Sequence, residues 1–211
     1  MKSPKIFAAL LVFITFTGLA FVTLSKKSDD IISSTNRSIT YEEKNDYTNA
    51  IAELQKIYND YSSNYVLNTR LGWLYYNKKD YQKSKIYYSK ALEIYKNSIE
   101  AMLGLTLPLS GLNDWDAVKQ TYLSILKLDA NNYTANLRLG QIYLNGGDYQ
   151  QAKRYLEKAF VQYPSEYEPN LSLGWTLYYL GDKQKAKELF TSALMLVKND
   201  SLASQGYELV K

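Results

Sequence analysis

Three close pairs of carboxylates come nearest to a catalytic arrangement in this chain: Glu42 with Glu43, Asp114 with Asp116, and Glu166 with Glu168. Two carboxylates that flank a bond can act as general acid and as nucleophile or base, as they do in glycoside hydrolysis. These pairs stand at expected helix starts and turns, where acidic residues ordinarily cap helices or carry solvated charge. No Gly-rich phosphate loop or metal-ligand spacing accompanies them. We therefore expect no catalytic residues, no metal and no cofactor.

The composition excludes several further chemistries. The 211-residue chain contains no Cys and no His, which removes disulfides, thiolate zinc sites, Cys nucleophiles and His-based acid–base catalysis. Its formal net charge is only +4, from 25 basic and 21 acidic residues, and this balance is too even for a nucleic-acid-binding surface. The sequence predicts a protein that is not an enzyme and does not bind nucleic acid.

The elements that position these residues repeat every 34 residues. The copies contain "NDYTNAIAELQKI", "KDYQKSKIYYSKA", "NDWDAVKQTYLSI", "GDYQQAKRYLEKA" and "GDKQKAKELFTSA", and their aspartates are Asp46, Asp80, Asp114, Asp148 and Asp182. Each Asp precedes a helical pattern, where its carboxylate can accept hydrogen bonds from the exposed amides of the first turn. Small or apolar residues follow on one helix face, as Ala152, Leu156, Ala159 and Phe160 do in the fourth copy.

An earlier helix precedes the Asp in each of the last four copies. Its marker, eight residues before the Asp, is Gly72, Thr106, Gly140 or Gly174. We expect this helix to end near Asn77, Gly111, Asn145 and Leu180, with Gly146-Gly147 supplying one of the turns. Pro108 falls inside one copy, where we expect a kink rather than the loss of the helix.

The fourth copy carries a recognisable motif: Leu139, Gly140, Tyr143, Ala152, Leu156, Ala159 and Pro164. This pattern at this period resembles the tetratricopeptide repeat (TPR). The resemblance implies an all-α fold, an α-solenoid of stacked antiparallel helix pairs (a TPR superhelix). The chain departs from the family pattern where Trp is usual, at Asn68, Met102, Asn136 and Asn170. The fold alone does not decide function, because it serves many partners.

The repeat phase divides the chain into domains. A TPR domain covers 39–211, with a degenerate repeat at 39–64, full repeats at 65–98, 99–132, 133–166 and 167–200, and a C-terminal capping helix at 201–211. A cap is expected because end repeats otherwise expose an apolar face. Residues 25–38 are polar and are predicted to form a flexible linker.

The N-terminal segment is predicted to be a single hydrophobic helix within 1–24. Ile6 to Leu24 carry no charge and would span roughly 28 Å as a helix, which is close to the thickness of a bilayer core. We expect a signal anchor, with the TPR domain held outside the cytoplasm, in the periplasm or at the cell surface. Because Gly18-Leu19-Ala20 could serve as a cleavage site, a cleaved signal peptide and a secreted or periplasmic protein are the alternative.

The family resemblance also implies an inner groove, lined by one side of each first helix. The residues expected there are Thr69, Trp73, Tyr76, Asn77, Leu103, Leu107, Leu137, Gln141, Leu144, Asn145, Leu171, Trp175 and Tyr178. A groove of this apolar and aromatic character is typical of a protein-binding surface. The alternative is that Trp73 and Trp175 mainly pack against neighbouring first helices.

These features predict a membrane-tethered adaptor or scaffold that binds a segment of a partner protein. The alternative is a scaffold that self-assembles within a membrane-associated complex. The family's basic clamp for C-terminal carboxylates is not expected, since only Arg70 and Arg138 resemble it. The sequence does not indicate the partner, the membrane or the oligomeric state.

Overall fold

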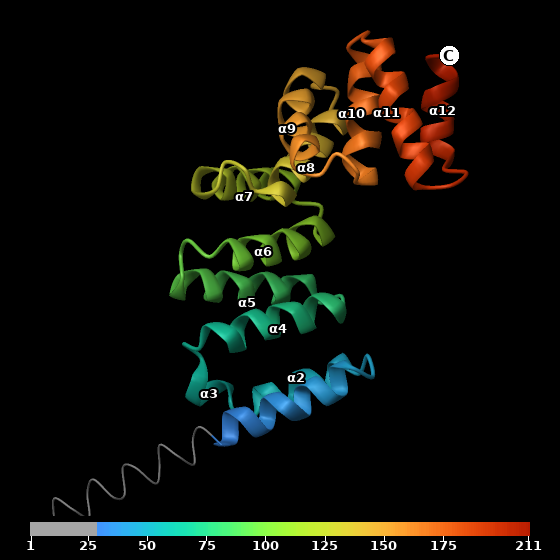
Figure 1. Cartoon of the computed structure of the whole chain (residues 1–211). Helices are drawn as coiled ribbons and strands as arrows, with labels where there is room; N and C mark the ends of the chain where they lie inside the picture. The colour runs from blue at the N-terminus through green and yellow to red at the C-terminus, as the bar shows by residue number, and fades with distance from the viewer. Residues whose placement is uncertain (1–28) are drawn as a thin grey trace, which may run out of the picture. The chain divides into compact units, whose positions relative to one another are not determined.

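The computed structural model describes residues 29–211, and all regular structure in this range is helical (Figure 1). The all-α prediction is therefore confirmed for these residues. The chain divides into two compact units, the first ending at Lys96 and the second covering Asn97–Lys211. The hydrophobic helix predicted within 1–24 lies outside the described residues. Among residues 29–211, no helix is both long enough and apolar enough to cross a membrane.

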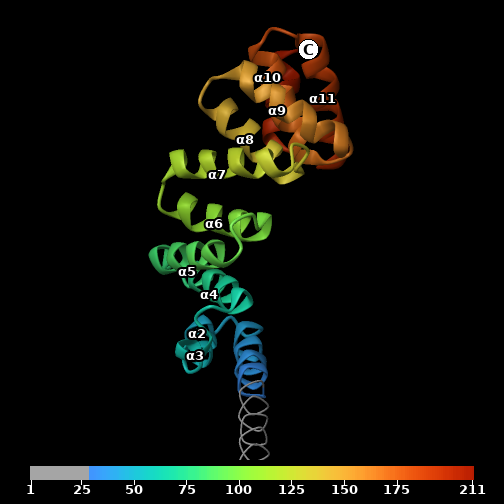
Figure 2. The ribbon, with the colours of Figure 1, turned by 90° about the vertical axis from the view of Figure 1, so that its left-hand side faces the viewer.

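The first helix described in the first unit covers residues 29–42. The unit continues with α2 (Tyr47–Gln55), α3 (Tyr58–Tyr61), α4 (Tyr65–Asn77) and α5 (Tyr81–Ile94) (Figure 2). Helices α4 and α5 pack against each other as one hairpin. Each repeat has a first helix and a second helix, and α5 is the second helix of its repeat. Because α2 and α3 occupy the positions 34 residues before α5, they are together the second helix of the preceding repeat, interrupted at residues 56 and 57.

Residues 29–38 correct the prediction of a flexible linker over 25–38, because they belong to the helix at 29–42. Ser34 and Ser38 are buried, and the Arg37 guanidinium donates to the Glu53 carboxylate of α2 at 2.8 Å and to Ser33 and Ser34. The small serine side chains allow close packing, and the hydroxyls of Ser33 and Ser34 accept hydrogen bonds from Arg37. The segment is the first helix of the repeat whose start the sequence placed at residue 39.

The second unit repeats the same hairpin. Its helices are α6 (Ile99–Gly111), α7 (Trp115–Leu128), α8 (Tyr133–Asn145), α9 (Tyr149–Gln162), α10 (Tyr167–Tyr179), α11 (Lys183–Leu196) and α12 (Ser201–Leu209). Consecutive elements pack as α6–α7, α8–α9 and α10–α11, and α12 packs against α10 and α11. The predicted helix ends at Asn77, Gly111 and Asn145 are confirmed, and α10 ends one residue before Leu180. Helix α6 continues through Pro108, so the helix is not lost; the kink stays a prediction.

The repeated aspartates cap the second helices as predicted. The side chains of Asp46, Asp80, Asp114, Asp148 and Asp182 each accept a hydrogen bond from the backbone amide three residues later. The residue before each Asp has a positive φ, between 58° and 85°, which turns the chain from one helix into the next. Glycine adopts this conformation at little cost, which explains Gly147 and Gly181, whereas the other copies use Asn or Lys.

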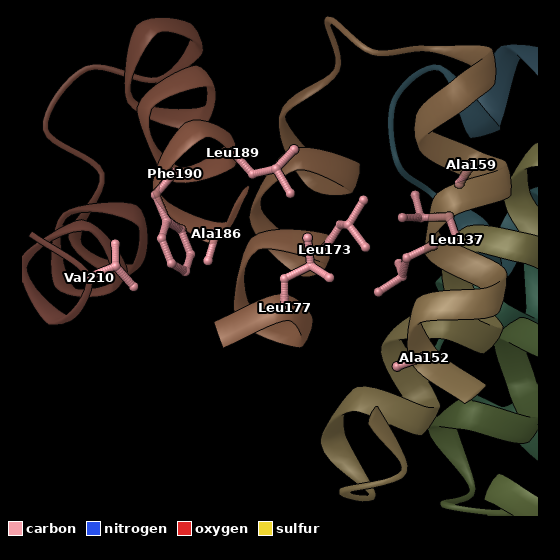
Figure 3. Packing of buried hydrophobic residues seen from close by; sticks show 10 residues of the cluster. Leu137, Ala152, Ala159, Leu173, Leu177, Ala186, Leu189, Phe190 and Val210 are labelled. Atoms are coloured by element: carbon pink, nitrogen blue, oxygen red, sulfur yellow. The ribbon is translucent and has the colours of Figure 1, made fainter. Parts of the chain in front are cut away.

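Close helix contacts explain the glycines of the first helices. A Cβ on Gly174 of α10 would lie 2.9 Å from the ring of Phe190 of α11, so any side chain there would force the helices apart. Phe190 is fully buried in a cluster that also holds Leu173 and Leu177 of α10 and Val210 (Figure 3). This cluster forms the base on which the outward-facing residues of α10 rest.

Buried asparagines stand where the family usually has Trp. Asn68, Asn136 and Asn170 are each no more than 1% exposed, and each side-chain amide donates to the carbonyls four and six residues earlier. The donated bonds hold the loop between two repeats against the next first helix, so the substitution exchanges apolar packing for hydrogen bonds that fix the loop.

Candidate functional site

A cavity of about 930 Å³ opens in the second unit, among residues of α8, α10 and α12 and the turn between α8 and α9. We call it the aromatic groove. Its lining residues carry no formal charge, and they are Gln141, Leu144, Asn145, Gly146, Gly147, Tyr149, Leu171, Ser172, Trp175, Tyr178, Tyr179, Leu202, Gln205 and Leu209. The structure thus brings together in one cavity six residues that the sequence assigned to a groove: Gln141, Leu144, Asn145, Leu171, Trp175 and Tyr178.

Aromatic rings from α9 and α10 form a connected series along the groove. Tyr149 stacks on Tyr179, with ring centroids 4.5 Å apart and planes 13° apart. Trp175 lies 6.0 Å from Tyr179 at 30°, and it meets Tyr178 edge-on at 5.8 Å. Trp175 also contacts the buried Phe190 edge-to-face at 5.2 Å, so its indole is held from below while it still lines the cavity.

Polar contacts fix the α8 side of the groove. The Arg138 guanidinium donates to the side-chain oxygen Oε1 of Gln141 and to the Glu168 carboxylate, both at 2.8 Å. The Gln141 amide in turn donates to the Ser172 hydroxyl at 3.2 Å, which links α8 to α10. The ion pair lies beside the groove and neutralises itself, so the wall presents amides and a hydroxyl without net charge.

Helix α12 supplies a wall that the site prediction missed. Leu202, Gln205 and Leu209 line the cavity, and Leu202 and Leu209 remain about half exposed. The repeat period contained the signal, since one further step of 34 residues from Glu168, Leu171 and Trp175 reaches these three positions. The sequence assigned this segment only a capping role, which it also fulfils through the buried Ala203 and Gly206.

A hydrogen bond at the start of α10 positions α12. Burial and a hydrogen bond to the Asp200 carboxylate raise the pKa of the Tyr167 phenol to about 12. Asp200 also caps α12 by accepting from the Ala203 amide at 2.7 Å. One carboxylate thus joins the beginnings of two of the helices that line the groove, α10 and α12.

Three predicted groove residues of the second unit lie elsewhere. Leu137 is only 2% exposed and belongs to the core cluster with Leu156 and Leu173, so its assignment to the groove is wrong. The repeat position is the same as that of Leu171, but here the side chain is covered by neighbouring core residues. Leu103 and Leu107 of α6 are half-buried and do not line the cavity, and Leu103 packs against the α7 and α8 core.

The predicted residues of the first unit all lie on α4. Trp73 is 42% exposed, and its indole N–H donates to the Glu42 carboxylate at 2.8 Å. The same carboxylate accepts from the Arg70 guanidinium at 2.6 Å. Tyr76 lies beside Trp73 with centroids 6.1 Å apart, while Thr69 and Asn77 are half-buried and donate to backbone carbonyls of α4.

The candidate catalytic carboxylates have structural contacts. Glu42 joins the helix at 29–42 to α4, Asp114 caps α7, and Glu168 pairs with Arg138. Each of these carboxylates therefore helps to start a helix or to join two first helices. Within residues 29–211, no group of three or more Asp and Glu side chains is arranged to hold a metal ion.

A family model described as tetratricopeptide repeat matches residues 137–203, the range that forms most of the groove. This region is therefore similar in sequence to tetratricopeptide repeats. A second family model, described as an uncharacterized protein conserved in bacteria, matches residues 23–126. Comparison with curated proteins finds no match.

Solved structures show the same fold over most of the chain. A TPR protein from Parabacteroides merdae superposes with a TM-score of 0.75 at 17% identity, over 86% of this chain and 72% of that one. MamA from Desulfovibrio magneticus gives 0.71 at 18%, over 82% and 98%. YrrB, described as a TPR protein with an unusual peptide-binding site, gives 0.68 at 20%, over 90% and 98%. At these identities the likeness shows the TPR fold alone.

Proposed function

We propose that this chain is a TPR scaffold that binds a segment of a partner protein in the aromatic groove. The observation that carries the proposal is the convergence of α8, α10 and α12 on one cavity without charged residues, lined by aromatic and aliphatic side chains together with amides and a hydroxyl. Its volume lies within the roughly 300–1,000 Å³ of typical ligand sites. Trp and Tyr are enriched among the side chains that contribute most to protein–protein binding, and Trp175, Tyr178 and Tyr179 line this cavity.

Two further points favour binding over catalysis. One carboxylate of each candidate pair has a structural role: Asp114 caps α7, Glu42 pairs with Arg70, and Glu168 pairs with Arg138. In addition, the peptide-binding site named for YrrB occurs on the same fold, which is consistent with a segment-binding role here.

Substitutions on α12 test the proposal with little effect on the core. Leu202→Gln combined with Leu209→Gln makes the α12 wall polar at two half-exposed positions. We expect the double variant to lose at least about tenfold in co-purified partner, because the apolar wall is lost. Val161→Gln, at a residue 76% exposed on α9 outside the groove, is the matched control and should co-purify partner normally. Equal recovery from the double variant and the control would refute the proposal.

Self-assembly is the second candidate, because one surface of the second unit is apolar without lining the groove. Met195, Leu196 and Val197 are consecutive at the end of α11 and are 83%, 44% and 38% exposed. A second copy could cover this surface. Sedimentation of the full chain at increasing concentration tests the idea: association should appear and should be abolished by Met195→Lys. A mass independent of concentration would exclude it.

We also propose that the charge-free run from Ile6 to Leu24 tethers the scaffold to a membrane, with the repeats outside the cytoplasm. The support is the length and apolarity of the run between flanking lysines. The intact mass of the mature chain distinguishes an anchor, which keeps residue 1 onward, from a cleaved signal. Release of the intact chain by alkaline washing of membranes would contradict the tether.

A further inference from the structure

The electrostatics of the aromatic groove restrict what it can bind. Its lining contains no Lys, Arg, Asp or Glu, and Arg138, which donates to the lining residue Gln141, already pairs with Glu168 at 2.8 Å. A charged segment would lose hydration in this cavity without gaining an opposite charge, and the uncompensated loss costs affinity. The complementary occupant is therefore an uncharged segment.

The ring geometry favours flat apolar side chains. Tyr149, Tyr179 and Trp175 follow one another with interplanar angles of 13° and 30°, and Tyr178 meets Trp175 at 89°. These four aromatic residues all line the same cavity, so aromatic surface is part of what a bound segment would contact. Pyrrolidine rings pack against aromatic side chains of this kind, as they do where proline-rich segments dock in aromatic-lined grooves.

The polar groups of the groove favour an extended backbone over a helix. Gln205, Asn145 and the tyrosine hydroxyls can donate hydrogen bonds into the cavity. A polyproline II segment makes no internal hydrogen bonds, so its carbonyls accept from outside donors. An α-helix satisfies its own carbonyls except in its last turn and would leave most of these donors unused.

We propose that the aromatic groove binds an uncharged, proline-rich segment in the polyproline II conformation. This inference rests on the proposed function and specifies the class of partner segment. The tyrosines and Trp175 contact the proline rings, and the amides of Gln205 and Asn145 hydrogen-bond the carbonyls of the segment. Because such a segment is already stiff when free, it loses little conformational entropy on binding.

A panel of labelled peptides tests the inference on the full 211-residue chain by fluorescence anisotropy. Four peptides of equal length are compared: proline-rich and uncharged, helical and uncharged, glutamate-rich, and lysine-rich. We expect the proline-rich peptide to bind at least about tenfold more tightly than the others. Comparable or tighter binding of another peptide, or binding of none, would overturn the inference.

Variants of one ring locate the binding. Tyr179 is half exposed, so Tyr179→Ala should fold and should weaken proline-rich binding at least about tenfold, whereas Tyr179→Phe keeps the ring and should retain most of the affinity. Tyr76→Ala in α4 is the matched control and should change the affinity by less than about twofold. An unchanged affinity of Tyr179→Ala would overturn the inference.

The outcomes separate this inference from the proposed function. If the uncharged helical peptide binds and the Leu202→Gln, Leu209→Gln variant abolishes that binding, the groove is a segment-binding site and only the polyproline assignment fails. If, in contrast, no peptide binds and the same variant leaves partner capture by the whole protein unchanged, the polyproline assignment and the proposed function both fail.

Discussion

Trp73 and Trp175 occupy the same position of their repeats but have different surroundings. In the first unit the indole N–H of Trp73 is already bonded to Glu42, and 42% of the residue faces solvent. In the second unit Trp175 rests edge-to-face on the buried Phe190 and lines a cavity with two other first helices. Among the residues from 29 to 96, the first helices are the helix at 29–42 and α4, whereas the second unit includes α8, α10 and α12 as first helices.

The comparison shows that the repeat position alone does not make a binding residue. A groove needs consecutive first helices, a packed base beneath the aromatic residue, and an aromatic ring that lines a cavity. The second unit meets these conditions through α12 and Phe190. In the first unit, the Glu42 carboxylate instead accepts from the indole N–H of Trp73 and from the Arg70 guanidinium.

The largest expected effect comes from removing the base of the groove. Phe190→Ala should lower the free energy of unfolding by about 3–5 kcal/mol, because the ring is fully buried and its neighbours Gly174 and Gly206 cannot fill the space. Urea denaturation of the full chain measures the loss. Met195→Ala, at an exposed residue of the same helix, should stay within about 0.5 kcal/mol. A loss below about 1 kcal/mol for Phe190→Ala would contradict the packing described here.

The buried asparagines give the next comparison. Asn68→Leu and Asn170→Leu each remove the donor for two loop carbonyls, which should cost about 1–3 kcal/mol. Asn68→Leu should cost more, because the carbonyl oxygen of Asn68 also accepts from the Tyr58 hydroxyl at 3.0 Å. Paired urea titrations decide the order, and an equal or larger loss for Asn170→Leu would show that the additional bond contributes nothing.

Two arginines at equivalent positions sharpen the comparison further. Arg70 and Glu42 have side chains about one quarter exposed, whereas Arg138 and Glu168 are 42% and 47% exposed. We expect Arg70→Ala to cost about 1–3 kcal/mol and Arg138→Ala at most about 1 kcal/mol, since water screens the exposed pair. The cost of Arg138→Ala should also shrink in high salt more than that of Arg70→Ala does. A larger loss of stability for Arg138→Ala than for Arg70→Ala would contradict the conclusion that the less exposed ion pair is the stronger one.

The smallest expected effect is an acid sensitivity in the first unit. Hydrogen bonds from Lys56 and then Arg37 lower the pKa of Glu53 below its ordinary value of 4.5. Because the folded-state pKa is depressed, the associated stability is present above the ordinary pKa and is lost as the pH falls through the folded value. Glu53→Gln should therefore lose less stability than the parent chain when the pH is lowered below about 4.5. Parallel losses in the two proteins would exclude Glu53 as the source.

Much of the fold could be predicted from the spacing of a few residues. Asp148 and its counterparts cap helices because a carboxylate at that place satisfies exposed amides, a local effect that needs no knowledge of the tertiary structure. The glycines that face second helices were recognisable for a similar reason. The helix at 29–42 was not, since its serines pack well only because Arg37 reaches Glu53 on another helix.

The site could be predicted only in part. Trp175, Tyr178 and Leu171 followed from the repeat position, but Leu137 at an equivalent position is buried by side chains distant in sequence. Tyr149 and Tyr179 reach the cavity through ring stacking that the repeat pattern does not encode.

Site-specific crosslinking at equivalent positions tests the central claim most directly. A photoreactive residue at Leu171 of the second unit and one at Thr69 of the first unit probe the same repeat position in the two surroundings. If the aromatic groove is the binding site, the chain labelled at position 171 forms a covalent adduct with a partner segment, and the chain labelled at 69 does not. An adduct from position 69 alone, or equal adducts from both positions, would contradict the account.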